Sequence, residues 1–599
     1  MDILKYFIFA TIKLFSSMRS VAVIVMALSL MWLVSCENKQ GVEESQVDFR
    51  EATFNKAKGG KYYGGTFIYT EDYIPEDLFP HDVKDVITYR VATQVFDGLV
   101  RFNPATLEIE PALAKSWTVS EDGKTYTFHL RTDAKFQKIG RRITAEDVAY
   151  CLKLLATKHP NNSLFSSTIK NVIKGATAYY EGQAREVEGI KVVDDSTIVI
   201  ELEHPYQLFL QILAGPAGFV FPKEAVAQGE NGYYLKEIIG SGPFIVEQIS
   251  DSEVVLVKNP DYYLTDDVGN KLPFLDEVVI KRQKDRDLVI NEFLAGEIDM
   301  VYRLSTDEII SILESSPSRD LKYIDQRSPE MSTQMYVFNT AVPPFNDEAL
   351  RKALSYMIDR EDIYNRVLMG EAQSPARFGI VPPVFPEYHN NELQGYSYNE
   401  AEARKWLEQA QNKPDTIELM INEGDPIHMH VALAVYEYLK KFGIHLNIDV
   451  VSRQQWLERL QSGQFQMARL AWIADFPHPA SFLSIFYGSG VPDDPTAPAF
   501  PNVSRFKDPA FDENYINGLY APDKEKAYYH LLEAEKVVID KVPAIFLWYE
   551  ENYRILQPYV KDMFKNPMEY RDFRFVYFDK TTYEKTQEAY RKKAETPES

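Results

Sequence analysis

An arginine and an aspartate, Arg469 and Asp475, stand six residues apart in a segment whose residue types could bind a small charged molecule. Residues 467–474 are mostly apolar, which is typical of a strand buried on both faces. Two prolines, Pro477 and Pro479, follow at once and cannot continue a central strand. A carboxylate at the end of a buried strand costs free energy unless a cation meets it, so Asp475 is expected to attract a positive group.

The spacing of the two charges suits a short peptide. Side chains along a strand alternate between its faces, so Arg469 and Asp475 are expected on one face, together with Ala471 and Ile473. Their backbones would be roughly 20 Å apart at about 3.3 Å per residue. An arginine that reaches inward shortens that gap, and an extended tripeptide spans on the order of 10 Å. The segment therefore predicts two groups that could hold the two ends of a short zwitterion.

A structural role accounts for the same residues. Asp475 could form an Asx turn before a helix that Pro479 begins, and Arg469 could pair with a structural carboxylate. The segment alone leaves both interpretations open, and the rest of the chain has to decide between them.

Familiar catalytic and cofactor motifs are missing from the sequence. There is no Gly-x-Ser-x-Gly, no His-Glu-x-x-His, no phosphate-binding loop ending in Lys-Ser/Thr and no Gly-x-Gly-x-x-Gly. His428 and His430 alternate as strand metal ligands would, but both open a predicted helix, where a spacing of two points them apart. We therefore predict no enzyme, no metal site and no cofactor.

Composition limits the class of protein. A chain of 599 residues is too long for one core, so two or three domains are expected. Apolar residues make up 45% and charged residues 26%, which is ordinary for a globular protein. The net charge of −23 argues against a nucleic-acid partner, because phosphate contacts need a basic face.

The N-terminus resembles the export signal of a bacterial lipoprotein. An apolar run from Val21 to Val34 leads into Leu-Val-Ser-Cys36, which resembles a lipobox whose cysteine is lipidated. The alternative is a short membrane anchor with an incidental cysteine. Residues 1–17 are a second apolar stretch that such a signal does not need, so Met18 is a candidate start. The predicted arrangement is a signal peptide over residues 1–35 and a flexible polar tether over 36–63.

Only one other cysteine exists, Cys151, so the mature fold can have no disulfide within it, and Cys151 is expected in the core. No later segment offers the roughly 18 uninterrupted apolar residues of a membrane span.

Strands and helices alternate along the chain. The clearest hairpin lies within residues 111–136 and turns at Glu-Asp-Gly-Lys, and Thr144 with Asp147 has the spacing of a capping box before a helix through Leu155. By pattern, strands are expected at 64–70, 190–202, 244–257, 278–282, 444–451 and 544–548, and helices at 349–358, 400–410, 430–442, 456–460 and 533–540. The last twenty residues, 580–599, are charged and are expected to form a peripheral tail.

Several motifs in order resemble the bacterial extracellular solute-binding proteins of oligopeptide and dipeptide ABC transporters (family 5), and most closely their oligopeptide-binding lipoproteins. The resemblance spans about residues 64–579. It rests on Leu-Phe-Pro-His81, Val-Phe-Asp-Gly-Leu-Val100, Pro-Ala-Leu-Ala-Lys-Ser-Trp117, Gly-Ser-Gly-Pro-Phe244, Lys-Asn-Pro-Asp-Tyr-Tyr263, Ala-Gly-Glu-Ile-Asp299 and the long run from Phe338 to Arg360.

The resemblance assigns roles to residues of the first segment. Asp475 stands where the family's aspartate pairs with a peptide's α-ammonium, and Arg469 where an arginine meets the carboxylate of a tripeptide. His428 matches a histidine that serves longer peptides, and Trp472 and Trp456 match walls of the cleft.

Two stretches depart from the family pattern. Residues 137–143 lack its usual turn, and His478 replaces a frequent acid, which could alter specificity.

The implied fold is α/β, a two-lobed periplasmic-binding-protein-like fold with an inserted subdomain in lobe one. Lobe one would comprise residues 64–100, 216–320 and 543–579, the insertion 101–215, and lobe two 321–542. The resemblance further implies a monomer on the outer side of a bacterial membrane, held there by its lipid, that binds short peptides and docks on permease subunits.

Three alternatives stay open. The same fold could carry a nickel chelate, haem, an opine or an oligosaccharide, none of which needs a facing Asp and Arg. A lipid-anchored hydrolase would cleave a peptide that a carrier returns intact. An adhesin or chaperone-like protein would bind segments without regard to a free N-terminus.

Overall fold

The computed structural model describes residues 52–83, 85–230, 232–495 and 497–595. The expected signal peptide and Cys36 lie outside these residues. Most of the described chain, up to Tyr590, belongs to one compact unit. No helix among the described residues is long and apolar enough to cross a bilayer.

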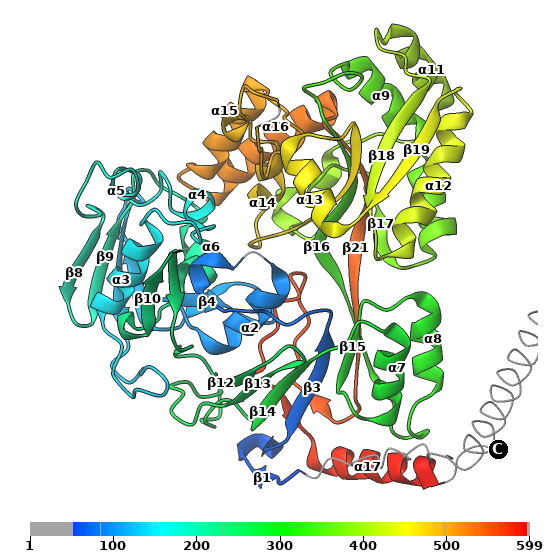
Figure 1. The fold of residues 1–599 in the computed structure, drawn as a ribbon. Coiled ribbons are helices and arrows are strands. Elements are labelled where there is room, and N and C mark those ends of the chain that lie inside the picture. Colours follow the sequence, from blue (N-terminus) through cyan, green and yellow to red (C-terminus); the bar gives the residue numbers. More distant parts are fainter. Residues whose placement is uncertain (1–51, 84, 231, 496, 596–599) are drawn as a thin grey trace, which may run out of the picture. The chain divides into compact units, whose positions relative to one another are not determined.

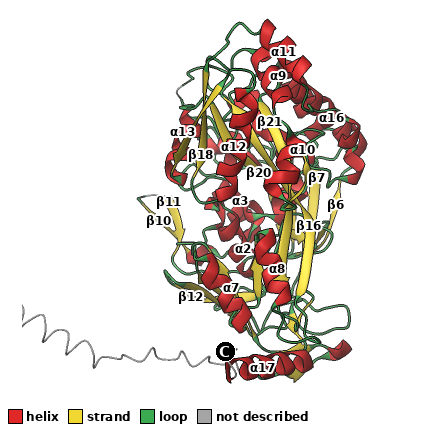
Figure 2. Ribbon diagram, turned by 90° about the vertical axis from the view of Figure 1, so that its right-hand side faces the viewer, coloured by secondary structure: helices red, strands yellow, loops and turns green. Residues whose placement is uncertain are grey.

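One mixed sheet of eleven strands runs through this unit, and its two ends form two lobes (Figure 1 and Figure 2). Lobe one holds β3 (Thr66–Glu71), β12 (Phe244–Ile249), β13 (Glu253–Lys258), β14 (Glu277–Arg282) and β15 (Met300–Tyr302), with α2 (Val86–Val95), α7 (Arg286–Ala295) and α8 (Thr306–Glu314). Lobe two holds β18 (Thr416–Asn422), β19 (His445–Val451) and β20 (Met467–Ile473), with α9 (Glu348–Met357), α11 (Glu400–Gln409), α12 (Pro426–Lys440) and α13 (Arg453–Ser462).

Two long antiparallel strands, β16 (Ile324–Phe338) and β21 (Ala544–Leu556), connect the lobes. Near lobe one, β21 pairs with β15, and near lobe two, β16 pairs with β20. Between these halves the register of the two strands shifts, from Pro329 opposite Glu551 to Thr333 opposite Tyr549. A bulge of this kind bends a strand pair, so the connection between the lobes has a defined bending point.

The inserted subdomain has a sheet of its own, in the order β6 (Ala114–Val119), β7 (Thr125–Leu130), β9 (Thr197–Glu201) and β8 (Ile190–Asp194). The predicted hairpin is confirmed as β6 and β7. The predicted capping box is also confirmed, because Thr144 and Asp147 bond reciprocally at the start of α3 (Ala145–Leu155). Cys151 on α3 is buried and unbridged.

Three further helices, α14 (Pro479–Leu483), α15 (Pro509–Leu519) and α16 (Lys524–Lys541), pack together in lobe two, beside the inserted subdomain (Figure 1). The helix predicted to begin at Pro479 is therefore confirmed.

Two segments expected to be peripheral, residues 55–63 and 580–590, pack onto lobe one instead. Residues 55–63, placed in the tether, form β1 (Asn55–Lys56) and β2 (Tyr62–Tyr63), which pair with each other. Lys61 beside β2 makes an ion pair of 2.8 Å with Asp562. The last segment, expected as a charged tail, forms α17 (Lys580–Glu595), in which Tyr583 and Tyr590 are buried. A few buried aromatic side chains can hold a polar stretch against an apolar surface of the fold. Sequence composition does not show that such a surface exists.

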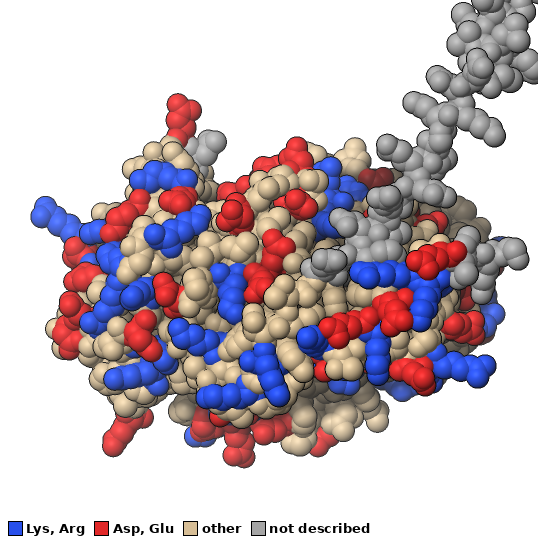
Figure 3. Space-filling view, turned by 90° about the horizontal axis from the view of Figure 1, so that it is seen from below, with Lys and Arg blue, Asp and Glu red and all other residues tan. Residues whose placement is uncertain are grey.

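On the face that Figure 3 shows, basic and acidic side chains are interspersed. The net charge of −23 therefore does not collect there in one continuous field.

Candidate ligand-binding cleft

The strand β20 has one open edge. Along its whole length it pairs with β16, but on its other side β18 pairs only with Met467 and Ala468. From Arg469 onward no strand of the described chain pairs with that side. Unpaired backbone groups along such an edge are a template for another strand.

The register identifies which backbone groups face the open edge. Ala474 donates its N–H to the carbonyl of Met331 on β16, so residue 474 belongs to a hydrogen-bonded pair with that strand. In an antiparallel ladder such pairs alternate, so residues 470 and 472 also point to β16. Ala471 and Ile473 therefore direct their N–H and C=O groups to the open side, where Ile473 is 39% exposed.

Asp475 stands just past the end of this edge. Its backbone N–H donates to Ser481 Oγ at 3.0 Å, but its carboxylate has no ion pair or hydrogen bond to any other described residue. The carboxylate is reached by solvent, yet burial among protein atoms raises its pKa to about 6. A desolvated carboxylate that solvent still reaches would favour an arriving cation.

The Asx-turn alternative for Asp475 does not hold. The residue that caps α14 is His478, whose Nδ1 accepts the N–H of Ala480 at 3.2 Å. His478 is buried against Tyr528, and burial lowers its pKa to about 3. This departure from the family pattern therefore serves the helix and leaves the carboxylate of Asp475 free for a ligand.

The inserted subdomain meets lobe two beside Asp475. Tyr515 on α15 lies within electrostatic reach of Asp475, and also of Tyr206 from the inserted subdomain. The ring of Tyr206 lies 5.9 Å from that of Tyr520, and Gln207 Nε2 donates to the carbonyl of Ala521 at 2.9 Å. Asp475 therefore lies near a contact that joins the inserted subdomain to lobe two.

Arg469 is held by neutral amides. Its Nη2 and Nε donate to Gln334 Oε1 at 2.7 and 3.1 Å, and its Nη1 donates to Asn422 Oδ1 at 3.3 Å. Among the described residues, it has hydrogen bonds to these two amides and no ion pair with a carboxylate. Burial lowers its pKa, and the more distant Glu550 and Asp425 oppose that effect. The arrangement orients a cation without neutralising it, which suits a ligand carboxylate.

His428 lies on α12 close to Arg469. It is buried, and its Nδ1 has no hydrogen-bond partner among the residues described. Burial, and then the charge of Arg469, lower its pKa to about 4, so the ring is neutral at physiological pH. The structure thus brings the two residues expected at the carboxylate end together.

The two predicted wall residues differ in their contacts. Trp456 on α13 donates its Nε1–H to the carbonyl of Arg469 at 3.0 Å, so it fixes the start of the open edge. Trp472 pairs with Thr333 and so lies on the opposite face of β20 from Arg469. Its ring faces that of Phe500 at 6.4 Å.

Sequence patterns gave no signal for several residues of this cleft. The side chains that hold Arg469, Gln334 and Asn422, come from segments far away in the chain, and so does Tyr206. None of them belongs to a motif, because each acts through its place in the sheet or at the edge of the cleft.

Arg469 and Asp475 stay well apart. Neither is among the charges that shift the pKa of the other. They mark the two ends of the open edge, with Ala471 and Ile473 between them.

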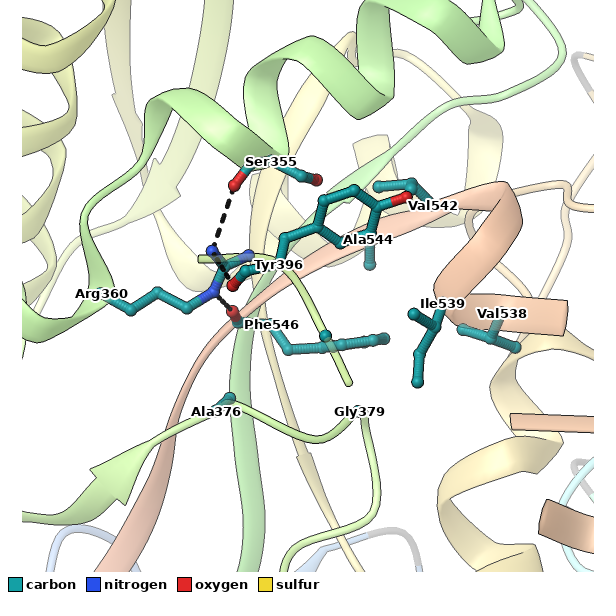
Figure 4. Close-up of a pocket in the computed structure, with 11 residues that line it drawn as sticks. Ser355, Arg360, Ala376, Gly379, Tyr396, Val538, Ile539, Val542, Ala544 and Phe546 are labelled. Atoms are coloured by element: carbon teal, nitrogen blue, oxygen red, sulfur yellow. Dashed lines mark hydrogen bonds between the residues drawn. The ribbon is translucent and has the colours of Figure 1, made fainter. Parts of the chain in front are cut away.

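A second arginine, Arg360 on α10 (Arg360–Asp362), lines a small internal cavity of lobe two (Figure 4). Its guanidinium donates to the carbonyls of Phe546, Ser355 and Tyr396. These bonds join three segments of lobe two, so Arg360 has a structural role.

A family model described as bacterial extracellular solute-binding proteins, family 5 Middle, matches residues 108–494. The periplasmic oligopeptide-binding protein OppA of Escherichia coli (strain K12) is 28% identical over 501 residues, 81% of this chain and 87% of the relative. Haem-binding protein A of Haemophilus influenzae is 25% identical over 589 residues, 94% of this chain and all of the relative.

The solved structure of a periplasmic binding protein, DppA from Helicobacter pylori in complex with the peptide STSA, superposes with a TM-score of 0.72. It covers 87% of this chain and 99% of that one at 24% identity. The expected two-lobed α/β fold is thereby confirmed.

Proposed function

Since the chain belongs to the bacterial extracellular solute-binding proteins of family 5, we propose that it captures short peptides between its two lobes and delivers them to the permease of an ABC importer. The observation that carries this proposal is the open edge of β20, which runs from an unneutralised arginine to an unpaired, desolvated carboxylate.

The ligand would bind as an added strand. Its α-ammonium pairs with Asp475 and its carboxylate with Arg469, so it runs antiparallel to β20. Ala471 and Ile473 supply the backbone hydrogen bonds between these ends, as in other cases of strand addition. Backbone bonds do not depend on side chains, so many sequences are accepted. His428, neutral beside Arg469, would contact the carboxylate of a longer peptide.

Closure completes the site. The bulge in β16 and β21 bends, and Tyr206 and Gln207 of the inserted subdomain reach Tyr520 and Ala521 of lobe two. Closing the cleft excludes water and strengthens the charge pairs inside it. The closed form is the one that docks on the permease.

We further propose that the chain acts as a monomeric carrier and not as an enzyme, so its ligand leaves uncleaved. A lipid on Cys36 would tether it to the outer side of a membrane. The boundaries expected above for the two lobes and for the insertion at 101–215 belong to the same proposal.

The termini of the ligand provide the decisive test. In calorimetry, trialanine with free ends is expected to bind, and N-acetyl-trialanine to bind at least about 30-fold more weakly, because acetylation removes the charge that pairs with Asp475. Equal affinity for the two would contradict the proposal and favour a chaperone-like role. Mass spectrometry of the recovered trialanine distinguishes a carrier from a hydrolase, since only a hydrolase yields cleaved product.

Mass spectrometry of small molecules that copurify with the protein tests the non-peptide cargoes. Haem, a nickel chelate, an opine or an oligosaccharide in stoichiometric amount would replace the peptide proposal.

A proline at residue 471 tests the added strand. Ala471→Pro removes the N–H that points to the ligand but leaves the ladder to β16, which uses residues 470, 472 and 474. We expect trialanine affinity to fall about 5- to 20-fold, as for the loss of one or two hydrogen bonds in a desolvated site, with an unchanged circular dichroism spectrum. As a control, Ala471→Ser keeps the N–H and should bind as wild type does. If the proline variant also binds as wild type does, the ligand does not use this edge.

A further inference from the structure

The loop beside the open edge carries an aromatic side chain that the fold itself does not use. Phe500 is 61% exposed, among the most exposed large apolar side chains described. Its loop is nevertheless anchored, because Ala499 donates its N–H to the carbonyl of Gln461 at 2.9 Å and Arg505 Nη2 donates to the same carbonyl at 3.0 Å. Phe500 is thus held in place at the mouth of the cleft without being buried.

Trp472 stands across from Phe500. The two ring centroids are 6.4 Å apart and the planes are tilted by 46°. Trp472 is itself only partly buried, and it projects from β20 between the two residues whose backbones face the open edge. An anchored exposed phenylalanine beside a half-buried tryptophan is an apolar surface that a third side chain could cover.

We propose that Trp472 and Phe500 form an aromatic slot that selects a large apolar side chain, aromatic above all, at one interior position of the bound peptide. The inference rests on the proposed function. It adds Phe500 as a residue that sets specificity, and it predicts a preference for certain ligand side chains that backbone hydrogen bonds along the open edge do not explain.

The geometry of an added strand says which ligand side chain enters the slot. Residues directly opposite each other on neighbouring strands project their side chains to the same face of the sheet. The ligand residue opposite Trp472 therefore projects to the face of Trp472, toward Phe500. Its two neighbours project to the other face, where Arg469 lies. Only one position of a tripeptide is selected in this way.

The test is a scan of three peptides against trialanine. Calorimetry measures the affinity of Phe-Ala-Ala, Ala-Phe-Ala and Ala-Ala-Phe for the wild type, Phe500→Ala and Phe500→Tyr. We expect the wild type to prefer phenylalanine at one position by about 10-fold, the middle one, since it lies between the two held termini. Phe500→Ala should reduce this preference to about 2-fold, with trialanine affinity unchanged, and Phe500→Tyr should keep it.

Tyr529→Ala is the matched control, because Tyr529 on α16 is also 61% exposed and makes no ring contact with Trp472. It should leave all four affinities unchanged.

The outcomes separate the two proposals. If the wild type binds the peptides and Phe500→Ala keeps the full preference, or weakens all of them alike, the slot does not exist although the peptide function stands. If the wild type binds none of them, the peptide function fails and the slot with it.

Discussion

Asp475→Asn is expected to weaken the binding of free trialanine by about 30- to 1,000-fold, the largest effect of any single change in the cleft. Asparagine has the shape of aspartate but no charge. The ammonium of the ligand would then enter a desolvated site without a counter-charge, since no other carboxylate among the described residues contacts the position. Isothermal titration calorimetry at pH 7.5 measures the change.

The same residue predicts a pH dependence. Burial raises the pKa of Asp475 to about 6 in the free protein. A carboxyl group whose pKa is raised on folding stabilises the fold in its protonated form, and this contribution is lost as pH rises from 3.8 through about 6. Ligand binding has the opposite dependence, because the ammonium needs the ionised form. Affinity should therefore fall as pH drops below about 6, by up to about tenfold per unit.

Two controls isolate this effect. Asp475→Asn should remove the part of the pH dependence centred near 6, although Glu550, whose pKa burial raises to about 7, still titrates. Asp493→Asn, whose side chain is fully exposed, should bind as wild type does. An Asp475→Asn variant that holds trialanine within about twofold of wild type would disprove the assignment of the ammonium site.

Arg571→Met is expected to lower the free energy of unfolding by about 3 to 5 kcal/mol. Arg571 is 1% exposed and joins Glu71 and Glu569 at 3.0 and 2.8 Å, with Tyr302 stacked on it at 4.1 Å. Arg90 also contacts both carboxylates, at 3.2 and 3.5 Å, and Arg554 contacts Glu569 at 3.3 Å, but the shortest ion pair of each carboxylate is the one with Arg571. Methionine fills the volume but removes the shortest ion pair of each carboxylate, which leaves Glu71 and Glu569 with only the longer pairs to Arg90 and Arg554. Denaturation in urea, monitored by fluorescence, measures the loss.

This buried network lies close to a contact between the lobes. Glu71 ends β3, and Tyr73, two residues on, lies within electrostatic reach of Arg453 on α13 of lobe two. Arg571→Met is therefore expected to weaken peptide binding as well, but less than it weakens the fold.

Two reference variants test whether burial and charge cause this loss of stability. Arg366→Met removes a pair with Asp362 whose arginine side chain is 75% exposed, and it should cost less than about 1 kcal/mol. Glu71→Gln combined with Arg571→Met should recover part of the lost stability, because one of the two buried carboxylates that lost its shortest ion pair is then neutral. If Arg571→Met costs no more than Arg366→Met, the network does not hold the lobe together.

Local patterns were sufficient for much of this protein. The hairpin of β6 and β7, the capping box at Thr144 and the helix that starts at Pro479 each depend on residues a few positions apart, whose propensities and spacing act within one element. The strand that ends just before Asp475 was predicted in the same way, but it is not buried on both faces throughout, because its second half is partly open and Ile473 is 39% exposed. Several family motifs, found in the expected order along the chain, were sufficient to predict the two-lobed fold.

Only the tertiary structure decided what the segment from Arg469 to Asp475 can bind. β20 has an open edge only because β18 leaves it after Ala468, and Asp475 is free only because His478 caps α14. Arg469 has no ion pair in the described chain because its guanidinium donates to the neutral side chains of Gln334 and Asn422, which lie on two other strands. Residues 55–63 and 580–590 pack on lobe one because a few of their tyrosines fit an apolar surface there. Each of these depends on pairing between distant segments, which is set by the free energy of the whole fold and leaves no local pattern in the sequence.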